Sequence, residues 1–293
     1  MQFEELTSSL GAPAYEREGV ALYQGDCVEL MSSLPAGAID LTVTSPPYNI
    51  GKEYERKLEL EEYLDWTQSW TQAVHRVTKT DGQFWLNLGY LEVSGRGRAV
   101  PLPYLMWDRT PFYMRQEVVW SYGAGTTTST AFAPRNEKFL WYLKDPSNYY
   151  FDLDSVRDPD VKYPNQKKNG KLKVNPLGKN PGDVWYIPKV TSGSSRASKE
   201  RTPHPAQFPE AVIERIILAC SAPGDVIMDP FMGSGTTASV AARLGRKCIG
   251  FELREDYLGV SANRIEASFD KLSSLLWGGV DDGELLAVND AGQ

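Results

Sequence analysis

The stretch VIMDPFMGSGTTASVAARLGRKCIGFE, residues 226–252, decides the fold that we predict for this chain. Its apolar run 226–228 is typical of a strand, residues 236–244 have the spacing of a helix, and residues 248–251 form a second apolar run. A turn with two glycines separates the first strand from the helix. Such a unit builds a parallel α/β sheet, and these sheets bind ligands beyond the carboxyl ends of their strands.

The residues of this turn indicate the kind of ligand. Gly233 and Gly235 leave room for a small ligand against the backbone, and Glu252 can accept both hydroxyls of a ribose. The pattern lacks the third glycine of a dinucleotide fingerprint, and no lysine precedes Thr236 as in a phosphate-binding loop. A ligand without a pyrophosphate is therefore favoured. The structural alternative is a tight strand–helix turn with an acidic residue nearby by chance.

The rest of the chain alternates between the two periodicities. Strands are predicted at residues 20–23, 39–44, 83–88, 112–122 and 138–143, and helices at 27–34, 63–77, 209–220 and 256–267, with a turn at 80–82. This alternation predicts one α/β domain with a mainly parallel sheet. We divide the chain into a loose arm 1–18, a first half 19–145, an insertion 146–202, a second half 203–267 and a frayed tail 268–293.

The insertion differs from the rest of the chain in pattern and charge. It shows no sustained periodicity, and residues 185–187, Trp-Tyr-Ile, are its one predicted buried anchor. Between residues 157 and 201 there are 11 basic and 4 acidic residues, although the whole chain of 293 residues has a net charge of −7. A basic segment on an acidic body favours a polyanionic partner, and the alternative is a solvated, lysine-rich loop.

A second motif follows the strand predicted at 39–44. Proline at positions 46 and 47 fixes the backbone and removes two N–H donors, so the strand ends there. An exocyclic amine on a base is a poor nucleophile and must be oriented. The carbonyl of Pro46 can accept from such an amine, Tyr48 can stack on the base, and Ser45 can bond the amine or the ring nitrogen beside it. A surface polyproline turn is the structural alternative.

Together and in this order, the two motifs resemble those of DNA amino-methyltransferases. In that family Ser-Pro-Pro-Tyr marks N4-cytosine enzymes, whereas Asp-Pro-Pro-Tyr or Asn-Pro-Pro-Tyr marks N6-adenine enzymes. The catalytic motif precedes the cofactor loop, as in the β arrangement, a permutation of the usual methyltransferase sheet. Residues 81–89, 135–141 and 182–185 also resemble the family. The resemblance implies a Rossmann-like S-adenosylmethionine (SAM)-dependent fold.

The resemblance also assigns residues to the site. The catalytic residues are Ser45, Pro46, Pro47 and Tyr48. The predicted SAM-binding residues are Asp26, Cys27, His204, Pro205, Ala206, Phe208, Asp229, Phe231, Gly233, Gly235, Thr236 and Glu252. Two of them could instead have a structural role alone, because Asp26 can be a helix N-cap and His204 a hydrogen-bonded loop histidine.

Duplex DNA is the implied partner, and its target base must be flipped out of the stack. The insertion then acts as a target recognition region, in which Lys167, Lys168, Lys171 and Lys173 contact phosphates, and Lys52 lies in a loop, 51–57, that closes over DNA. Adenine N6 methylation, a non-catalytic SAM- and DNA-binding protein, and an RNA or protein amide methyltransferase remain alternatives. A homodimer would use surface outside the motifs.

Composition excludes other classes. Three scattered cysteines and two histidines fit neither a disulfide framework nor a zinc site, so we predict no metal. The chain has no apolar run of about 20 residues and no signal-like N-terminus, which predicts a cytoplasmic protein without membrane spans. It also lacks the Pro-Cys dipeptide that cytosine C5 methylation uses.

Overall fold

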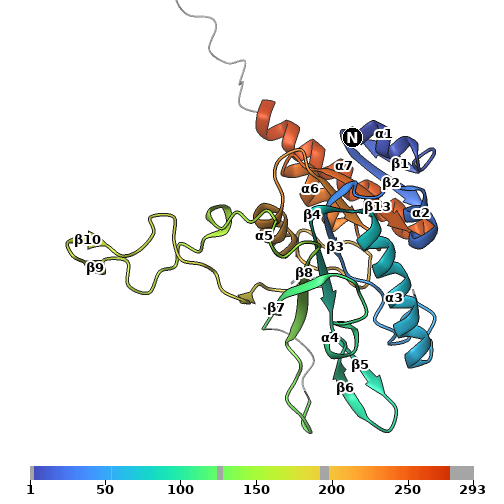
Figure 1. Ribbon diagram of the computed structural model, residues 1–293, viewed down its shortest axis with the longest axis horizontal. Helices are drawn as coiled ribbons and strands as arrows, with labels where there is room; N and C mark the ends of the chain where they lie inside the picture. Colours follow the sequence, from blue (N-terminus) through green and yellow to red (C-terminus); the bar gives the residue numbers. More distant parts are fainter. Residues whose placement is uncertain (1–2, 54, 124–127, 192–197, 278–293) are drawn as a thin grey trace, which may run out of the picture.

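The computed structural model describes residues 3–53, 55–123, 128–191 and 198–277. At its centre is a nine-stranded sheet (Figure 1). From one edge to the other its strands are β1 (Tyr15–Arg17), β2 (Val20–Gln24), β13 (Lys247–Glu252), β12 (Val226–Asp229), β3 (Ile39–Thr44), β4 (Thr78–Leu88), β8 (Asn136–Leu143), β7 (Tyr113–Ser121) and β11 (Val184–Tyr186). The run from β2 to β4 is parallel, and β8 is antiparallel to both neighbours. The predicted α/β class is confirmed.

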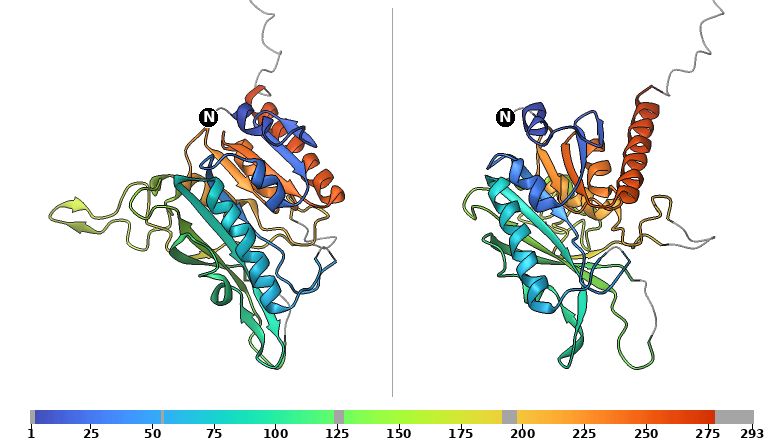
Figure 2. Two further views of the ribbon diagram at one scale, coloured as in Figure 1. Left: turned by 45° about the vertical axis from the view of Figure 1, so that its right-hand side comes forward. Right: turned by 90° about the vertical axis from the view of Figure 1, so that its right-hand side faces the viewer.

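Helices cover both faces of the sheet (Figure 2). On one face lie α1 (Phe3–Ser8), α2 (Cys27–Ser33) and α3 (Leu60–Val77), and on the other lie α5 (Glu210–Cys220), α6 (Thr236–Arg243) and α7 (Glu255–Trp277). Each face has its own core. Trp70 of α3 is fully buried in the first core, and Ile213 of α5 and Ile265 of α7 are fully buried in the second.

The chain changes face between β3 and β12, which are neighbours in the sheet. From β3 it continues through α3 on one face to β4, and from β12 it continues through α6 on the opposite face to β13. In open α/β sheets the crevice at such a reversal, outside the carboxyl ends of the strands, is where ligands bind. Both sequence motifs lie there, because one follows β3 and the other follows β12.

The two predicted halves interleave in this sheet. β12 and β13 come from the second half, yet they lie between β2 and β3 of the first. As a result β2, which belongs to the first half, pairs with β13 in the register Gln24↔Glu252. The end of β2 therefore belongs to the predicted cofactor side.

The prediction of a loose arm was wrong for its described residues. Phe3 and Leu6 of α1 are buried, and β1 pairs with β2 in the register Glu16↔Ala21. Two apolar side chains are too few to give a helical period. This segment is held by its contacts with the sheet, and a local sequence pattern cannot show such contacts.

The predicted turn at 80–82 is instead part of β4, whose register with β3 shifts there. A Cβ at Gly82 would lie 3.0 Å from the carbonyl oxygen of Asp40, so glycine permits the close approach of β3. At the other end of the chain α7 continues to Trp277, beyond the predicted residues 256–267. The part of the predicted tail at 278–293 lies outside the described residues.

The described residues of the insertion contain little regular structure, as predicted, but they contribute one strand to the sheet. β11 pairs with β7, and Trp185 and Ile187 are buried, whereas Tyr186 is 81% exposed. A small hairpin of β9 (Lys167–Lys168) and β10 (Lys171–Leu172) projects far from the body (Figure 1). A second hairpin, β5 (Tyr90–Val93) with β6 (Gly97–Pro101), and the short helix α4 (Pro103–Met106) were not predicted.

Candidate active site

The Ser-Pro-Pro-Tyr turn follows β3 directly, and hydrogen bonds from α3 and from the loop before α3 hold it in place. Tyr63 of α3 donates a hydrogen bond to the carbonyl oxygen of Pro47 (2.8 Å). Asn49 has a φ of 61°, and its side-chain amide bonds both backbone groups of Leu58, at 2.7 and 2.9 Å. The chain therefore leaves β3 in a fixed direction, as the two prolines predict.

A polar network connects this turn to the next two strands. The hydroxyl oxygens of Ser45 and Tyr48 are 3.1 Å apart. The Tyr48 hydroxyl lies 2.9 Å from Oδ1 of Asn87 and 3.2 Å from Oε2 of Glu137, and it can donate to either. Asn87 is near the carboxyl end of β4, and Glu137 is near the start of β8. Neither was among the predicted site residues, although both lie in stretches that resemble the family.

Burial shapes the acid–base properties of this network. It raises the pKa of the Tyr48 hydroxyl well above its ordinary value, an effect that the nearby Glu137 carboxylate adds to. Burial also raises the pKa of Glu137, while its hydrogen bond from Tyr48 and the charges of Lys138 and Lys189 lower it. Tyr48 therefore stays a neutral donor, and Glu137 holds protons more readily than an exposed glutamate.

The cofactor turn begins at Asp229, a fully buried residue at the end of β12. Its carboxylate accepts hydrogen bonds from the hydroxyls of Thr44 (2.6 Å) and Thr237 (2.7 Å) and from the backbone N–H of Phe231 (3.1 Å). Burial raises the pKa of this carboxyl to about 6. Asp229 thus joins the end of β3, the turn itself and the first residues of α6.

Glu252 lies at the carboxyl end of β13, beside the turn. Its two carboxylate oxygens accept from the backbone N–H groups of Gly233 (2.8 Å) and Arg254 (2.9 Å). Asp26 follows the adjacent strand β2, and its carboxylate caps α2 by accepting from the N–H groups of Val28 (2.8 Å) and Glu29 (3.2 Å). Asp26 is therefore a helix N-cap, and its exposed side chain still lies at the same edge as Glu252.

Beside Gly235, the side on which a Cβ would stand is occupied by α7. A Cβ there would lie 2.8 Å from Cα of Ser261, so α7 occupies that side, and the φ of 75° also requires glycine. At Gly233 a Cβ would lie 3.1 Å from Nε2 of His204. These glycines allow α7 and the histidine segment to approach the turn.

His204 is buried, and its ring is held on two sides. Nδ1 lies 2.7 Å from the carbonyl oxygen of Ala206, and the ring packs edge-on against Tyr257 of α7. Burial lowers the pKa of the imidazole, so the neutral form is favoured. Pro205 and Ala206 are exposed, and Phe208 packs against the core.

Two other predicted cofactor residues lie mainly in the interior. The ring of Phe231 packs edge-on against Trp66 and Trp70 of α3, with centroids 5.6 and 5.2 Å apart. Cys27 is buried in the first turn of α2, where burial raises the pKa of its thiol to about 12. Both side chains pack in the core beneath the residues that line the crevice.

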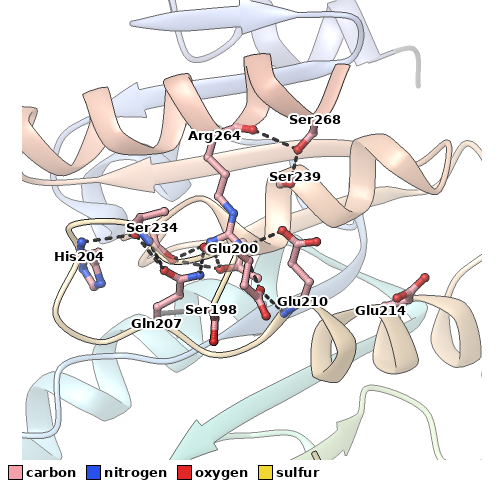
Figure 3. Close-up of polar contacts among 12 residues, drawn as sticks. Ser198, Glu200, His204, Gln207, Glu210, Glu214, Ser234, Ser239, Arg264 and Ser268 are labelled. Carbon is pink, nitrogen blue, oxygen red and sulfur yellow. Dashed lines mark hydrogen bonds and ion pairs between the residues drawn. The ribbon is translucent and has the colours of Figure 1, made fainter. Parts of the chain in front are cut away.

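A buried arginine of α7, which we did not predict from the sequence, binds the end of the cofactor turn (Figure 3). Arg264 of α7 donates to the hydroxyl of Thr236 (2.7 Å) and to the carboxylate of Glu210 (2.8 Å), and it lies 3.3 Å from the carboxylate of Glu200. In Figure 3 its side chain descends from α7 between the histidine segment and α5. The turn, α5 and α7 are thus connected through one guanidinium group.

The predicted DNA-binding lysines are exposed. Lys167, Lys168, Lys171 and Lys173 lie on or beside the β9–β10 hairpin, whose turn residues Asn169 and Gly170 have φ values of 52° and 78°. An Asn-Gly pair with positive φ at both positions is a hairpin signal that the sequence did contain. Lys52 is exposed in the loop after the catalytic turn, of which Tyr54 lies outside the described residues.

Within the part of the chain that the structure describes, no group of three or more His, Cys, Asp or Glu side chains could hold a metal ion. Among the same residues, no helix has the length and apolar character to cross a membrane.

Known protein sequences are similar to this chain over most of its length. Residues 39–263 match the model of a family described as DNA methylase. The Type II methyltransferase M.ScaI of Streptomyces caespitosus is 62% identical over 268 residues, which are 92% of this chain and 88% of that protein. The DNA adenine methyltransferase YhdJ of Escherichia coli (strain K12) is 31% identical over 268 residues, 87% of this chain and 85% of that protein.

Among solved structures, the cytosine-N4-specific PvuII DNA methyltransferase is similar with a TM-score of 0.67 and 24% identity. The similarity covers 90% of this chain and 95% of that chain, and at this identity it shows a shared fold. The family match extends over most of the chain, and its two ends enclose both the catalytic turn and the cofactor turn. The chain therefore belongs to the DNA methylase family.

Proposed function

We propose that this DNA methyltransferase transfers a methyl group from SAM to the exocyclic N4 amine of a flipped cytosine in a specific duplex sequence. The observation that carries the proposal is the position of Ser45. It follows β3 directly, one residue after Thr44, whose hydroxyl is bonded to the first residue of the cofactor turn. A base held by the first turn and a methyl donor held by the second would meet at the same crevice.

SAM fits the chemistry of the donor set at that crevice. Glu252 accepts one backbone N–H on each carboxylate oxygen, and each oxygen keeps a further lone pair for a ribose hydroxyl. The exposed carboxylate of Asp26, at the next strand end, suits the amino group of an adenine. When bound, SAM supplies an electrophilic methyl group on a sulfonium centre.

The turn residues suit an amine as the nucleophile. The N–H groups of the target amine can donate to Ser45 Oγ and to the carbonyl oxygen of Pro46, which directs the nitrogen lone pair out of the base plane. No covalent bond between enzyme and base is needed, so the chain's task is to align the nitrogen with the methyl group. Serine at this position supports cytosine through the resemblance, since Ser-Pro-Pro-Tyr marks N4-cytosine enzymes in this family.

Duplex DNA would lie across the same edge of the sheet. The β9–β10 hairpin, which projects from the body, supplies exposed positive charge for phosphates through Lys167, Lys168, Lys171 and Lys173. Lys52, in the loop after the catalytic turn, supplies a cation close to the crevice itself. The chain would thereby hold DNA on both sides of the flipped base.

Adenine N6 is the second candidate, and a specific observation favours it. YhdJ, a DNA adenine methyltransferase by name, is similar over most of its length. The same turn could orient an adenine amine, since both amines are exocyclic groups next to a ring nitrogen. The two candidates share the fold, the cofactor and the chemistry, and they differ only in the base that enters the pocket.

Methyl transfer from labelled SAM to unmethylated duplex DNA tests the proposal, with nucleosides identified after digestion. We expect label in N4-methylcytosine with the native chain. Ser45→Ala should lower the rate by about 10²-fold while SAM binding by calorimetry stays within a factor of two. Label in N6-methyladenine instead would contradict the base assignment, and label confined to RNA would contradict DNA as the substrate.

A further inference from the structure

We propose that Glu137 is the final acceptor of the proton that the target amine loses, and that Ser45 and Tyr48 conduct this proton to it. The inference rests on amine methylation as the proposed function, but it holds for either base. Glu137 lies at the start of β8, outside both sequence motifs, and the catalytic turn does not itself contain a carboxylate.

The reaction leaves one proton to remove. The amine nitrogen forms a bond to the methyl carbon while the bond from that carbon to sulfur breaks, and its electron pair stays on sulfur. The nitrogen then carries a positive charge and two protons beside the new methyl group. Release of one proton restores a neutral secondary amine, so a group connected to the amine must accept it.

The three side chains form a continuous path for that proton. Ser45 Oγ is 3.1 Å from the Tyr48 hydroxyl, which is 3.2 Å from Oε2 of Glu137. Ser45 takes the proton from the amine and passes its own to Tyr48, which passes its own to Glu137. Both hydroxyls end neutral, and the carboxylate ends as a carboxylic acid. One proton has moved, and no other reactant is needed.

Asn87 does not compete for the proton, although it touches the same path. Its Oδ1 lies 3.3 Å from Ser45 Oγ and 2.9 Å from the Tyr48 hydroxyl, and it can accept from either hydroxyl before the proton is passed on. An amide oxygen is too weak a base to store a proton at neutral pH. Asp229 is another buried carboxylate, and its oxygens already accept from the Thr44 and Thr237 hydroxyls and the Phe231 N–H.

The surroundings of Glu137 suit a proton acceptor near neutral pH. Lys138 and Lys189 face it with positive charge and favour its ionised form, while burial opposes ionisation more strongly. The Tyr48 hydroxyl can donate to it, and burial together with the charge of Glu137 raises the pKa of Tyr122. Burial and the adjacent carboxylate make a Tyr48 phenolate unfavourable, so the proton passes through the tyrosine without stopping there.

Glu137→Gln is the direct test, since glutamine keeps an acceptor for Tyr48 but cannot take up the proton. We expect its single-turnover rate on unmethylated duplex DNA to fall at least about 10²-fold. The native rate should decline at acidic pH as Glu137 becomes protonated, and this acid limb should disappear in the variant. Glu117→Gln, on the neighbouring strand β7, removes a carboxylate outside the network and should keep the native rate and limb.

Two measurements separate proton transfer from folding and binding. SAM affinity by calorimetry should be unchanged in Glu137→Gln. In infrared titration of the protein without SAM, the native spectrum minus that of Glu137→Gln should show a carboxylic acid band that persists to higher pH than for an ordinary glutamate, and the subtraction removes the band of Asp229. Tyr48→Phe keeps the ring and the carboxylate but breaks the path, so it should also lose the rate and the acid limb. It decides the matter if the glutamine variant fails to fold.

A Glu137→Gln variant with the native rate would overturn the inference, and so would a slow variant that keeps the acid limb. A Tyr48→Phe variant with the native rate and limb would overturn it as well. Failure of the proposed function looks different. If the native protein methylates adenine, the base assignment fails while the relay is tested on that product. If the native protein methylates no DNA, the function fails before any variant is compared.

Discussion

The hydroxyl of Thr44 donates a 2.6 Å hydrogen bond to the carboxylate of Asp229. These residues are 185 positions apart in the chain, and each ends one of two neighbouring parallel strands. Ser45 follows the first residue, and the cofactor turn follows the second. Because both groups are buried, this bond fixes the distance between the turn that orients the base and the turn that holds the methyl donor.

Replacing Thr44 tests whether that bond positions the two turns. Thr44→Val keeps the shape but leaves the buried Asp229 without one of its donors, which should cost about 1–3 kcal/mol of unfolding free energy. Since the turns lose their link, we expect the methyl-transfer rate to fall about 10-fold or more. Chemical denaturation and single-turnover kinetics measure the two effects.

Thr42, two residues earlier on β3, provides the matched control. It is fully buried, and its hydroxyl has no hydrogen-bond partner among the described residues. Thr42→Val should therefore be neutral or stabilising, with a native rate. Equal effects of the two substitutions would contradict a special role for Thr44.

Asp229 predicts a pH dependence of stability with a definite sign. Burial raises its pKa in the folded chain to about 6, above the ordinary 3.8. Between these values the unfolded chain releases the proton and the folded chain keeps it, so the unfolding free energy falls as pH rises from about 4 to 6. The stabilisation by the protonated Asp229 is fully present below the unfolded pKa of 3.8, and about 3 kcal/mol of unfolding free energy is lost as the pH rises to about 6.

Asp229→Asn removes this titration and isolates its contribution. The unfolding free energy of the native chain minus that of the variant should decline between pH 4 and 6 and then stay level. Denaturation at a series of pH values measures the difference. A difference that increases with pH in this window would show that the folded carboxyl is more acidic than we infer.

The buried arginine of α7 predicts a large difference between two arginines that reach the same carboxylate. Arg264 contacts Glu210 from a buried position, and Arg243 lies 3.6 Å from Glu210 with its side chain 39% exposed. Arg264→Met should cost about 3–5 kcal/mol and weaken SAM binding, because it removes the buried guanidinium that joins Thr236, Glu200 and Glu210. Arg243→Met should cost less than about 1 kcal/mol. Similar losses in denaturation experiments would contradict this account.

The β9–β10 hairpin predicts a change in the salt dependence of DNA binding. Replacing Lys167, Lys168, Lys171 and Lys173 by glutamine should reduce the slope of log affinity against log salt by about 0.9 for each phosphate that is no longer neutralised. Replacing the same four by arginine keeps the charge and should keep the slope. A glutamine variant with the native slope would show that these lysines do not contact phosphates.

Features that depend on neighbouring residues could be predicted from the sequence. The two turns, the strands beside them and the helix 209–220 follow from prolines, glycines and apolar spacing within short windows. The hairpin around Asn169 and Gly170 also had a local signal. It was missed because its strands are two residues long and carry mainly lysine, so they show no alternation.

Features that depend on the order of strands could not be predicted in this way. Asn87 and Glu137 meet Tyr48 only because β4 lies beside β3 in the sheet and β8 lies beside β4. Arg264 meets Thr236 because α7 folds back over α6, 28 residues further along the chain. The contact of α7 with Gly235 is another example, because Ser261 is distant from Gly235 in the sequence.

Identification of the methylated nucleoside tests the central claim most directly. The native chain would be incubated with unmethylated duplex DNA and methyl-labelled SAM, and the digested product analysed by mass spectrometry. Serine as the first residue of the catalytic turn, where N6-adenine enzymes of the family have Asp or Asn, predicts N4-methylcytosine and no other labelled nucleoside. N6-methyladenine as the product would contradict it, because the serine would then orient the amine of a different base.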